Sequence, residues 1–378
     1  MVKAVPSPSD GQNNTGPQLT LPSRCYTEKD VFDAEMTSIF RRSWQLAGNA
    51  ADVAANGTYF TTTVTGQDIA VIRGRDGVLR AFFNVCQHRG HRLLKGKGKL
   101  KLAITCPYHA WAYGLDGRLR AAPNADHVPG FDGSRVGLVP VGVEEVGPVI
   151  LVNLDASAPG FDEQFPDVRE ELQEFAPRLS ELTFFERSSS RYECNWKVGV
   201  ENYAECYHCA HAHPTLTTSL LDPDAYKVEL FDSHHRHSTG MTSGDSHLYD
   251  IDPSTGAHAK EFRAWLLWPN LSLQVNPGSN FVIFSFVPDG PQTSFVHVDW
   301  FFGPWVDDAE RRRIIDEHRE TTLIEDTHLV KEVQIGLNNL GYDRGVLMVD
   351  DTHRTSGKSE HPVAHFQNQW RNATQYSE

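Results

Sequence analysis

The chain is organised around one stretch, Trp196-Lys-Val-Gly-Val-Glu-Asn-Tyr-Ala-Glu-Cys-Tyr-His-Cys-Ala-His-Ala-His-Pro214, which is dense in chemically active side chains. A buried polar group without a partner costs about 1–3 kcal/mol, so a core helix does not carry so many carboxylates, thiols and imidazoles without a purpose. Glu201, Glu205 and His208 recur at helical spacing, and aromatic residues are interleaved with them. The stretch therefore predicts a helix that forms one wall of a buried polar site.

Pro214 predicts where this helix ends, because proline disfavours the α conformation of the residue before it. We expect the helix to stop at about His211 or Ala212 and His213 to fold back toward His208. Two neutral imidazoles with a carboxylate nearby suit Fe, Zn, Ni or Cu. The alternative is a set of ordinary surface histidines at a helix C-terminus, where the helix dipole favours them. His211 remains an alternative ligand.

Cys206 and Cys209 have the Cys-x-x-Cys spacing of redox pairs and of half a zinc site. No second pair of this spacing follows, and no βαβ pattern surrounds the motif. We therefore interpret both as small buried residues of the helix with reduced thiols.

A second group of metal-ligating residues comes earlier in the chain, Cys86-Gln-His88 and Cys106-Pro-Tyr-His109. Two such pairs on successive loops fit a Cys₂His₂ zinc site or a Rieske [2Fe–2S] cluster, in which one iron takes two thiolates and the other two imidazoles. A zinc finger places its histidines together after both cysteines, whereas here Cys and His alternate. The order favours the cluster. His91 is then interpreted as a surface residue or a residue that supports the ligands, and not as a ligand.

Composition excludes several classes of protein. The 378 residues carry a net charge of −14, which argues against a nucleic-acid partner. No run approaches eighteen apolar residues, so we expect no membrane span. Residues 1–20 lack the apolar core of a signal peptide, and the six cysteines fit free thiols or ligands in a reducing cytoplasm.

Periodicity divides the chain into four parts. Residues 1–20 are expected to be a flexible tail, and 21–44 a helix that packs on the domain formed by residues 156–378. Alternating segments separated by Gly-containing turns predict an all-β domain over 45–155. Residues 156–378 predict an α+β domain with an antiparallel sheet, and 215–258, rich in His and Asp, are interpreted as a loop over the site.

Together, the two groups of metal-ligating residues resemble those of the Rieske non-haem iron oxygenases, from about Trp44 to the C-terminus. The resemblance implies an α+β fold with an N-terminal all-β Rieske [2Fe–2S] domain and a helix-grip catalytic domain with an antiparallel sheet. It implies that the cluster is held by Cys86, His88, Cys106 and His109. It implies a mononuclear Fe(II) held by two histidines and one distant carboxylate, namely His208, His213 and Asp326.

The same resemblance assigns the carboxylates. The family places Asp in the third-ligand segment, so Asp326 is preferred to its neighbour Glu325. Glu205 matches a bridging carboxylate that joins a ligand histidine to a cluster histidine of the neighbouring subunit, and Asn202 is placed with it in the catalytic set. Ring-hydroxylating members generally have Asp at the position of Glu205. Glutamate is expected in the group that acts on quaternary ammonium compounds.

The resemblance implies a terminal oxygenase that uses O₂ and electrons from NAD(P)H, delivered by a separate flavin/iron–sulfur reductase. We expect a homotrimer that hydroxylates a carbon beside a quaternary or tertiary nitrogen, with N-demethylation as the net outcome. The alternatives are an aromatic-ring hydroxylating oxygenase, an electron-transfer protein without catalysis, and a structural-zinc protein. A betaine-like substrate needs an aromatic box and a cationic anchor for its carboxylate. The aromatic candidates are Tyr203, Trp265, Trp268, Phe284 and Phe301.

Overall fold

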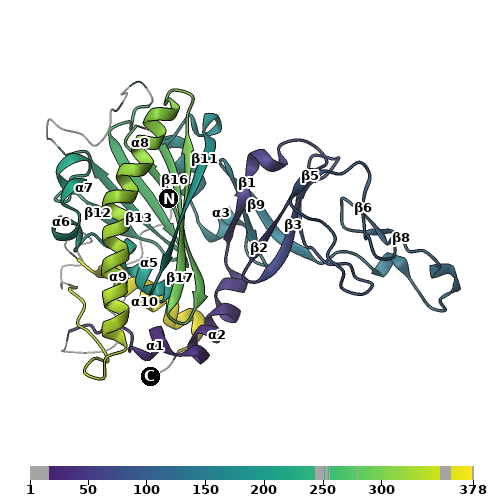
Figure 1. Ribbon diagram of the computed structural model, residues 1–378, viewed down its shortest axis with the longest axis horizontal. Coiled ribbons are helices and arrows are strands. Elements are labelled where there is room, and N and C mark those ends of the chain that lie inside the picture. The colour runs from purple at the N-terminus through teal and green to yellow at the C-terminus, as the bar shows by residue number, and fades with distance from the viewer. Residues whose placement is uncertain are drawn as a thin grey trace. The chain divides into compact units, whose positions relative to one another are not determined.

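The computed structural model describes residues 17–242, 251, 254, 256–278, 280–349 and 359–376. The chain divides into two compact units, one of Phe40–Phe161 and one that combines Met1–Ile39 with Asp162–Glu378 (Figure 1). Most of the tail expected over 1–20 lies outside the described residues.

The unit Phe40–Phe161 is built from antiparallel strands, which confirms the prediction of an all-β domain. Its larger sheet has the order β1-β10-β9-β4-β3-β2-β5, and β6-β7-β8 form a second, three-stranded sheet. The strands are β1 (Gln45–Asn49), β2 (Thr58–Val64), β3 (Gln67–Arg73), β4 (Leu79–Phe83), β5 (Lys97–Lys99), β6 (Ala103–Thr105), β7 (Ala112–Gly114), β8 (Leu119–Ala121), β9 (Pro140–Val146) and β10 (Val149–Asn153).

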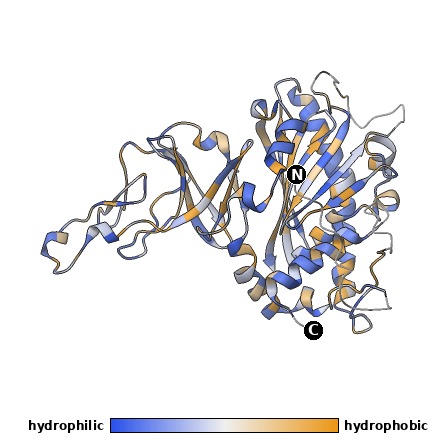
Figure 2. Ribbon diagram, turned by 180° about the vertical axis from the view of Figure 1, so that it is seen from behind, coloured by the Kyte–Doolittle hydropathy of each residue, from blue (hydrophilic) through white to orange (hydrophobic). Residues whose placement is uncertain are grey.

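The larger unit contains one antiparallel sheet in the order β11-β17-β16-β15-β14-β13-β12. Polar and apolar residues are mixed in this unit, as the blue and orange of the ribbon show (Figure 2). The antiparallel sheet, together with the helices of the same unit, confirms the predicted α+β fold with an antiparallel sheet. The strands are β11 (Thr183–Tyr192), β12 (Lys227–Leu230), β13 (His234–Gly240), β14 (Glu261–Leu267), β15 (Leu271–Asn276), β16 (Asn280–Gly290) and β17 (Thr293–Phe302).

Strands β12 and β13 correct the expectation of a loop over 215–258. The buried positions of β13 are occupied by polar residues, namely His234, His235, His237 and Thr239, so the strand is polar in sequence although these side chains are buried in the structure. A pattern of polar residues hides a strand from a search for apolar alternation. Residues 243–250 of the expected loop lie outside the described residues.

Helices pack on this sheet, and α8, a π-helical turn and α9 follow one another without a break across it (Figure 1). Helices α1 and α2 fall within the helical region predicted over 21–44. The helices are α1 (Arg24–Thr27), α2 (Lys29–Ser38), α3 (Phe161–Gln164), α4 (Val168–Phe175), α5 (Trp196–Ala204), α6 (Cys209–Ala212), α7 (Pro214–Ser219), α8 (Asp308–His318), the π-helical turn Arg319–Leu323, α9 (Ile324–Leu337) and α10 (His361–Thr374).

A buried ion pair anchors α5, the helix that leads into the site. Lys197 of α5 and Glu35 of α2 are both fully buried and form a salt bridge. The indoles of Trp196 and Trp370 donate hydrogen bonds of 2.9 and 2.6 Å to the same carboxylate. Removing one partner of such a pair leaves an uncompensated buried charge, so α2, α5 and α10 are held together at this point.

None of the helices in the described part of the chain is long and apolar enough to cross a membrane.

Candidate active site

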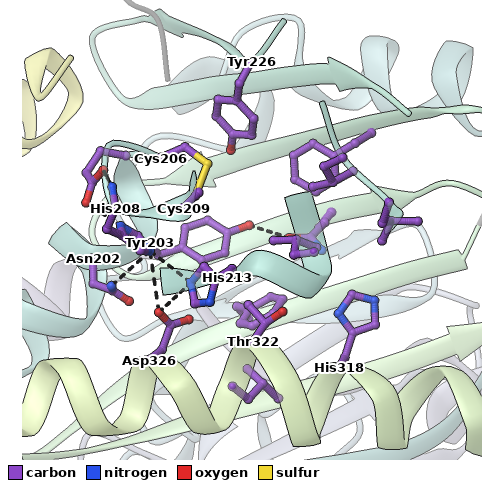
Figure 3. Close-up of a pocket in the computed structure, with 18 of the residues that line it drawn as sticks. Asn202, Tyr203, Cys206, His208, Cys209, His213, Tyr226, His318, Thr322 and Asp326 are labelled. Carbon is purple, nitrogen blue, oxygen red and sulfur yellow. Dashed lines mark hydrogen bonds and ion pairs between the residues drawn. A yellow bond between two sulfur atoms is a disulfide. The ribbon is translucent and has the colours of Figure 1, made fainter. Parts of the chain in front are cut away.

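Two histidines and one aspartate converge at a pocket in the larger unit (Figure 3). The Nε2 atoms of His208 and His213 lie 3.1 Å apart. Asp326 Oδ1 lies 3.1 Å from His213 Nε2 and 3.7 Å from His208 Nε2. Among the described residues, these are the only three His, Cys, Asp or Glu side chains that lie close enough together to hold one metal ion. We call them the triad.

A broken helix brings the two histidines together. His213 lies between α6 and α7, and α7 begins at Pro214 as its first residue. The predicted helix end near Ala212 is therefore observed. The expectation of one continuous helix from Trp196 is wrong, because α5 already ends at Ala204.

Glu205 is the residue that breaks this helix. Its backbone is extended, and its carboxylate accepts hydrogen bonds from the backbone N–H groups of Tyr207 and His208, which replace helical bonds. Its Oε1 also lies 2.7 Å from His208 Nδ1. The prediction that Glu205 shares a helical face with His208 is wrong, but the expected contact with the outer nitrogen of His208 is present.

The outer nitrogen of each triad histidine faces a carboxylate. His208 Nδ1 contacts Glu205 as above, and His213 Nδ1 lies 2.8 Å from Glu325 Oε2. An ionised carboxylate only accepts hydrogen bonds, so each Nδ1 carries the proton and each Nε2 presents a lone pair to the centre of the triad. The sequence offered Glu325 only as an alternative ligand, and its contact with His213 was not anticipated.

The donor set of the triad fits a cation. Asp326 Oδ1 is buried and, within the described part of the chain, accepts no hydrogen bond. Two lone pairs and one carboxylate oxygen thus face each other. Burial lowers the pKa of His213, but Asp326 and Glu325 outweigh it, and the pKa is raised above its ordinary value. Two imidazoles and one carboxylate are the facial set that binds non-haem Fe(II) and leaves open positions.

The remaining polar residues of the predicted site take different positions. Asn202 Nδ2 lies 3.4 Å from His208 Nε2, so this amide borders the triad. His211 is exposed and takes no part in the group of converging donors. Cys206 and Cys209 form a disulfide beside His208, so the prediction of reduced thiols is wrong. Their short separation across the α6 turn, 4.8 Å between Cα atoms, allows the bond.

A pocket of about 700 Å³ not filled by atoms, part of it open to solvent, extends from the triad. Tyr203 and Phe284 line it with ring centroids 5.2 Å apart, and Tyr226 and Phe262 line it at 6.1 Å. Tyr226 points into the pocket from the side opposite Asp326 (Figure 3). We call these four rings the aromatic wall. Tyr203 and Phe284 were expected to bind substrate, whereas Tyr226 and Phe262 were not identified from the sequence.

Three aromatic residues expected to bind substrate are not among those that line this pocket. The indole of Trp265 donates a 2.7 Å hydrogen bond to Glu171 of α4, and Trp268 packs against Phe366 of α10. Phe301 is buried against other rings of β11 and β16. Trp265 is three residues from Phe262, and successive residues of a strand face opposite sides, so only one of the pair can face the pocket.

Two polar residues of the pocket, Gln274 and Asn276, were also missed. A signal was present, because Ser272, Gln274 and Asn276 alternate with apolar residues along β15. Such alternation in a fully buried strand marks a polar wall. Thr322 lies in the π-helical turn before Asp326, a feature that frequently occurs at functional sites and has no clear sequence signature.

In the smaller unit, two loops of similar shape carry the second group of metal-ligating residues. The backbone N–H of Cys86 donates to His91 O, and the Cys86 carbonyl accepts from Gly90 N. The backbone N–H of Cys106 donates to the carbonyl of Trp111, and the Cys106 carbonyl accepts from the backbone N–H of Ala110. Gly90 and Ala110 both have positive φ, 72° and 56°.

The four donors of these loops fit a cluster better than one zinc ion. Cys86 and Cys106 are buried, with 2% exposure each, whereas His88 is exposed. The rings of His88 and His109 lie side by side, 4.7 Å between centroids. The four residues do not form a group that one ion could bridge, as zinc would require.

Family models match both units. The model of the Rieske [2Fe-2S] domain family matches residues 43–132. The model of the ring hydroxylating alpha subunit (catalytic domain) family matches residues 179–376.

The chain is similar over most of its length to proteins of known activity. It is 38% identical to the carnitine monooxygenase oxygenase subunit of Acinetobacter pittii, over 95% of this chain and 96% of that protein. It is 34% identical to the chloroplastic choline monooxygenase of Beta vulgaris, over 86% of this chain and 72% of that one. The structure of a quaternary ammonium Rieske monooxygenase, reported with insights into carnitine oxidation and inter-subunit electron transfer, matches with a TM-score of 0.83 and 35% identity, over 98% of this chain and all of the other.

Proposed function

Since this chain belongs to the Rieske non-haem iron oxygenases, we propose that it hydroxylates a carbon next to the nitrogen of a quaternary or tertiary ammonium compound. The observation that carries the proposal is the aromatic wall beside the triad, in a pocket that also contains Glu205 and Asp326. Aromatic faces attract an organic cation by about 0.5–2 kcal/mol per ring. The relatives named for carnitine and choline act on quaternary ammonium compounds, which supports the same substrate class here.

We propose His208, His213 and Asp326 as the ligands of a mononuclear Fe(II), and Cys86, His88, Cys106 and His109 as the ligands of the [2Fe–2S] cluster. When bound, these groups supply O₂ activation and one-electron delivery. Glu205 and Glu325 hold the imidazoles of His208 and His213 in the tautomer that presents Nε2 to the metal.

The residues of this chain then position the substrate. The aromatic wall binds the ammonium group, so that an N-methyl or N-methylene carbon lies beside the triad. Hydroxylation of an N-methyl carbon gives a hemiaminal, which breaks down to the secondary or tertiary amine and formaldehyde.

The alternative is hydroxylation of an aromatic ring. Structures of naphthalene dioxygenases share this fold at 19% identity, which supports the architecture alone. The pocket of this chain holds Gln274, Asn276, Thr322 and the carboxylate of Glu205 beside its rings, and an aromatic hydrocarbon has no partner for them. The ammonium substrate therefore accounts for more of the pocket.

We also propose the partners. A terminal oxygenase of this family needs a reductase, and we propose a flavin/iron–sulfur reductase that takes electrons from NAD(P)H in the cytoplasm. We propose a cyclic trimer in which Glu205 lies between His208 and a cluster histidine of the next subunit. A relative's structure is reported with inter-subunit electron transfer, which supports this arrangement. A head-to-tail interface that closes on itself forms a ring.

Turnover with two panels of compounds tests the proposed function. With a surrogate reductase and a trimethylammonium compound as substrate, the holoenzyme is expected to consume O₂. It is expected to release an amine or formaldehyde in proportion to the O₂ consumed. Aromatic acids are expected to give neither product. Coupled hydroxylation of aromatic acids, with no product from any ammonium compound, would show that the alternative is correct.

The His88→Cys variant tests the cluster ligands. Thiolate in place of neutral imidazole is expected to lower the reduction potential by on the order of 100 mV or more and to change the EPR spectrum, because Rieske centres lie well above all-cysteine clusters. Redox titration followed by visible absorption measures the shift. His91→Ala is the matched control, since His91 lies in the same loop but contributes its carbonyl to Cys86 N. An unchanged potential in His88→Cys would contradict the assignment.

A further inference from the structure

Among the described residues, the pocket beside the triad has carboxylates but no basic side chain that would balance a substrate carboxylate. Glu205 and Asp326 line it, and no Lys or Arg is among its described lining residues. His318 also lines it, but burial lowers the pKa of His318 to about 4, so the imidazole is neutral at pH 7. A divalent ion at the triad is balanced by Asp326 and Glu205, and Glu325 adds a further negative charge nearby.

Within the described part of the chain, the segments next to the lining residues add no Lys or Arg to this wall. Arg263 follows the lining residue Phe262, but its guanidinium lies 4.6 Å from the ring centroid of Phe175, on the α4 side of the sheet. Leu221 of the pocket wall pairs with Met241, and the sequence after it, Ser243-Gly-Asp-Ser-His-Leu-Tyr-Asp250, contains no Lys or Arg. Outside the described residues, the only Lys and Arg residues in the sequence are Lys3, Arg354 and Lys358.

The polar wall of the pocket is instead a chain of uncharged groups. Tyr203 donates its hydroxyl to Gln274 Oε1 at 2.7 Å, and Gln274 Nε2 donates to Asn276 Oδ1 at 2.7 Å. These two bonds fix the orientation of the Asn276 amide, so that its Oδ1 faces Gln274 and its Nδ2 points away from Gln274.

Two hydrogen-bonding groups in this wall lack a protein partner. Asn276 is 2% exposed, and its Nδ2 is buried without a hydrogen-bond partner among the described residues. Thr322 Oγ1, in the π-helical turn, is also buried without one. A buried donor left unpaired costs about 1–3 kcal/mol, so the wall favours a ligand that brings an acceptor oxygen.

We propose that the substrate carries, beside its cationic nitrogen, an uncharged acceptor oxygen, as in a hydroxyl, an ester or an amide, and not a carboxylate. This inference rests on the proposed function and narrows it. A neutral oxygen accepts from Asn276 Nδ2 and Thr322 Oγ1 at little cost in desolvation. A carboxylate gives up its water to the same two neutral donors without a countercharge in the wall, which costs far more.

Matched pairs of trimethylammonium compounds test the proposal. Each pair has the same carbon chain and ends in a carboxylate or in the corresponding methyl ester, amide or alcohol. The holoenzyme with a surrogate reductase is expected to give kcat/KM at least about tenfold higher for the uncharged member, measured as amine or aldehyde released per O₂ consumed. The stabilisation of the protein against heat by each member gives the same comparison independently of turnover.

Two variants locate the effect. The first ratio to measure is kcat/KM for a trimethylammonium alcohol divided by kcat/KM for the same compound without the hydroxyl group. Asn276→Leu is expected to lower this ratio by about tenfold, because leucine offers no hydrogen-bond donor. Ser285→Ala is the matched control, since Ser285 also has a buried hydroxyl without a partner among the described residues but does not line the pocket. That control is expected to leave the ratio unchanged.

The outcomes separate this proposal from the proposed function. Equal or higher kcat/KM for the carboxylate members overturns the inference and leaves the ammonium oxygenase intact. Turnover of aromatic acids alone overturns both. If Asn276→Leu fails to fold, a higher heat stabilisation of the wild-type protein by carboxylates than by their uncharged partners still overturns the inference.

Discussion

Asp326→Ala is expected to abolish turnover and remove the mononuclear iron while the cluster remains. The alanine deletes the carboxylate whose Oδ1 faces both Nε2 atoms of His208 and His213, and two imidazoles alone bind a divalent ion weakly. The cluster residues and the triad belong to different compact units of the chain, so the visible spectrum of the cluster should not change. Iron and acid-labile sulfide analysis is the measurement, and the remaining iron should equal the sulfide, as in a [2Fe–2S] cluster. His208→Ala and His213→Ala are expected to give the same result.

Glu325→Gln is the matched control for Asp326→Ala, because the two residues are adjacent on α9 and only Asp326 has an oxygen in the triad. Glu325 contacts the outer nitrogen of His213, so its loss is expected to weaken iron binding by about 10–100-fold without removing the site. Excess iron should restore turnover in Glu325→Gln and not in Asp326→Ala. The reverse pattern would move the ligand to Glu325.

Glu205→Gln is expected to keep both metal centres and slow the arrival of electrons at the mononuclear site by at least about tenfold. Glutamine has the same size and can cap the turn after α5, but it lacks the charge that holds a proton on His208 Nδ1. Oxidation of the pre-reduced cluster in a single turnover, with substrate and O₂ present, measures the step. Glu193→Gln is the control, since its carboxylate is exposed and pairs with Lys331.

Two observations would count against the role of Glu205. One is a wild-type single-turnover rate in Glu205→Gln with full iron content. The other is full activity of a monomer in sedimentation, which would exclude an electron path between subunits. Loss of iron in Glu205→Gln would instead show that the carboxylate mainly orients His208.

Several features of the fold followed from local sequence. Segments with alternating polar and apolar residues, separated by Gly-containing turns, were sufficient to predict the all-β domain. Pro214 was sufficient to predict the helix end at Ala212. The two Cys-His motifs lie in loops between short strands, as their spacing indicates. Each of these features depends on residues a few positions apart, and neighbouring residues interact in the same way in most contexts.

Other features depended on distant parts of the chain. The break of α5 at Ala204 was missed because a glutamate side chain, and no proline or glycine, replaces the helical hydrogen bonds there. Strand β13 was missed because its buried side chains are histidines. In both places the structure depends on which group a polar side chain contacts. The helix or strand propensity of a residue carries no information about that contact.

The sequence by itself determined the fold class, the two motifs that supply metal-ligating residues, and the convergence of His208 on His213. The tertiary structure decided which side chains share the pocket: it brought Asp326 from α9 to the histidines, turned Glu325 to the outer nitrogen of His213, and left Trp265 on the other face of the sheet. The physical reason is the range of the interactions. Spacing along the chain governs turns and local ligand pairs, whereas the docking of α9 places Glu325 and Asp326 against a histidine more than a hundred positions earlier.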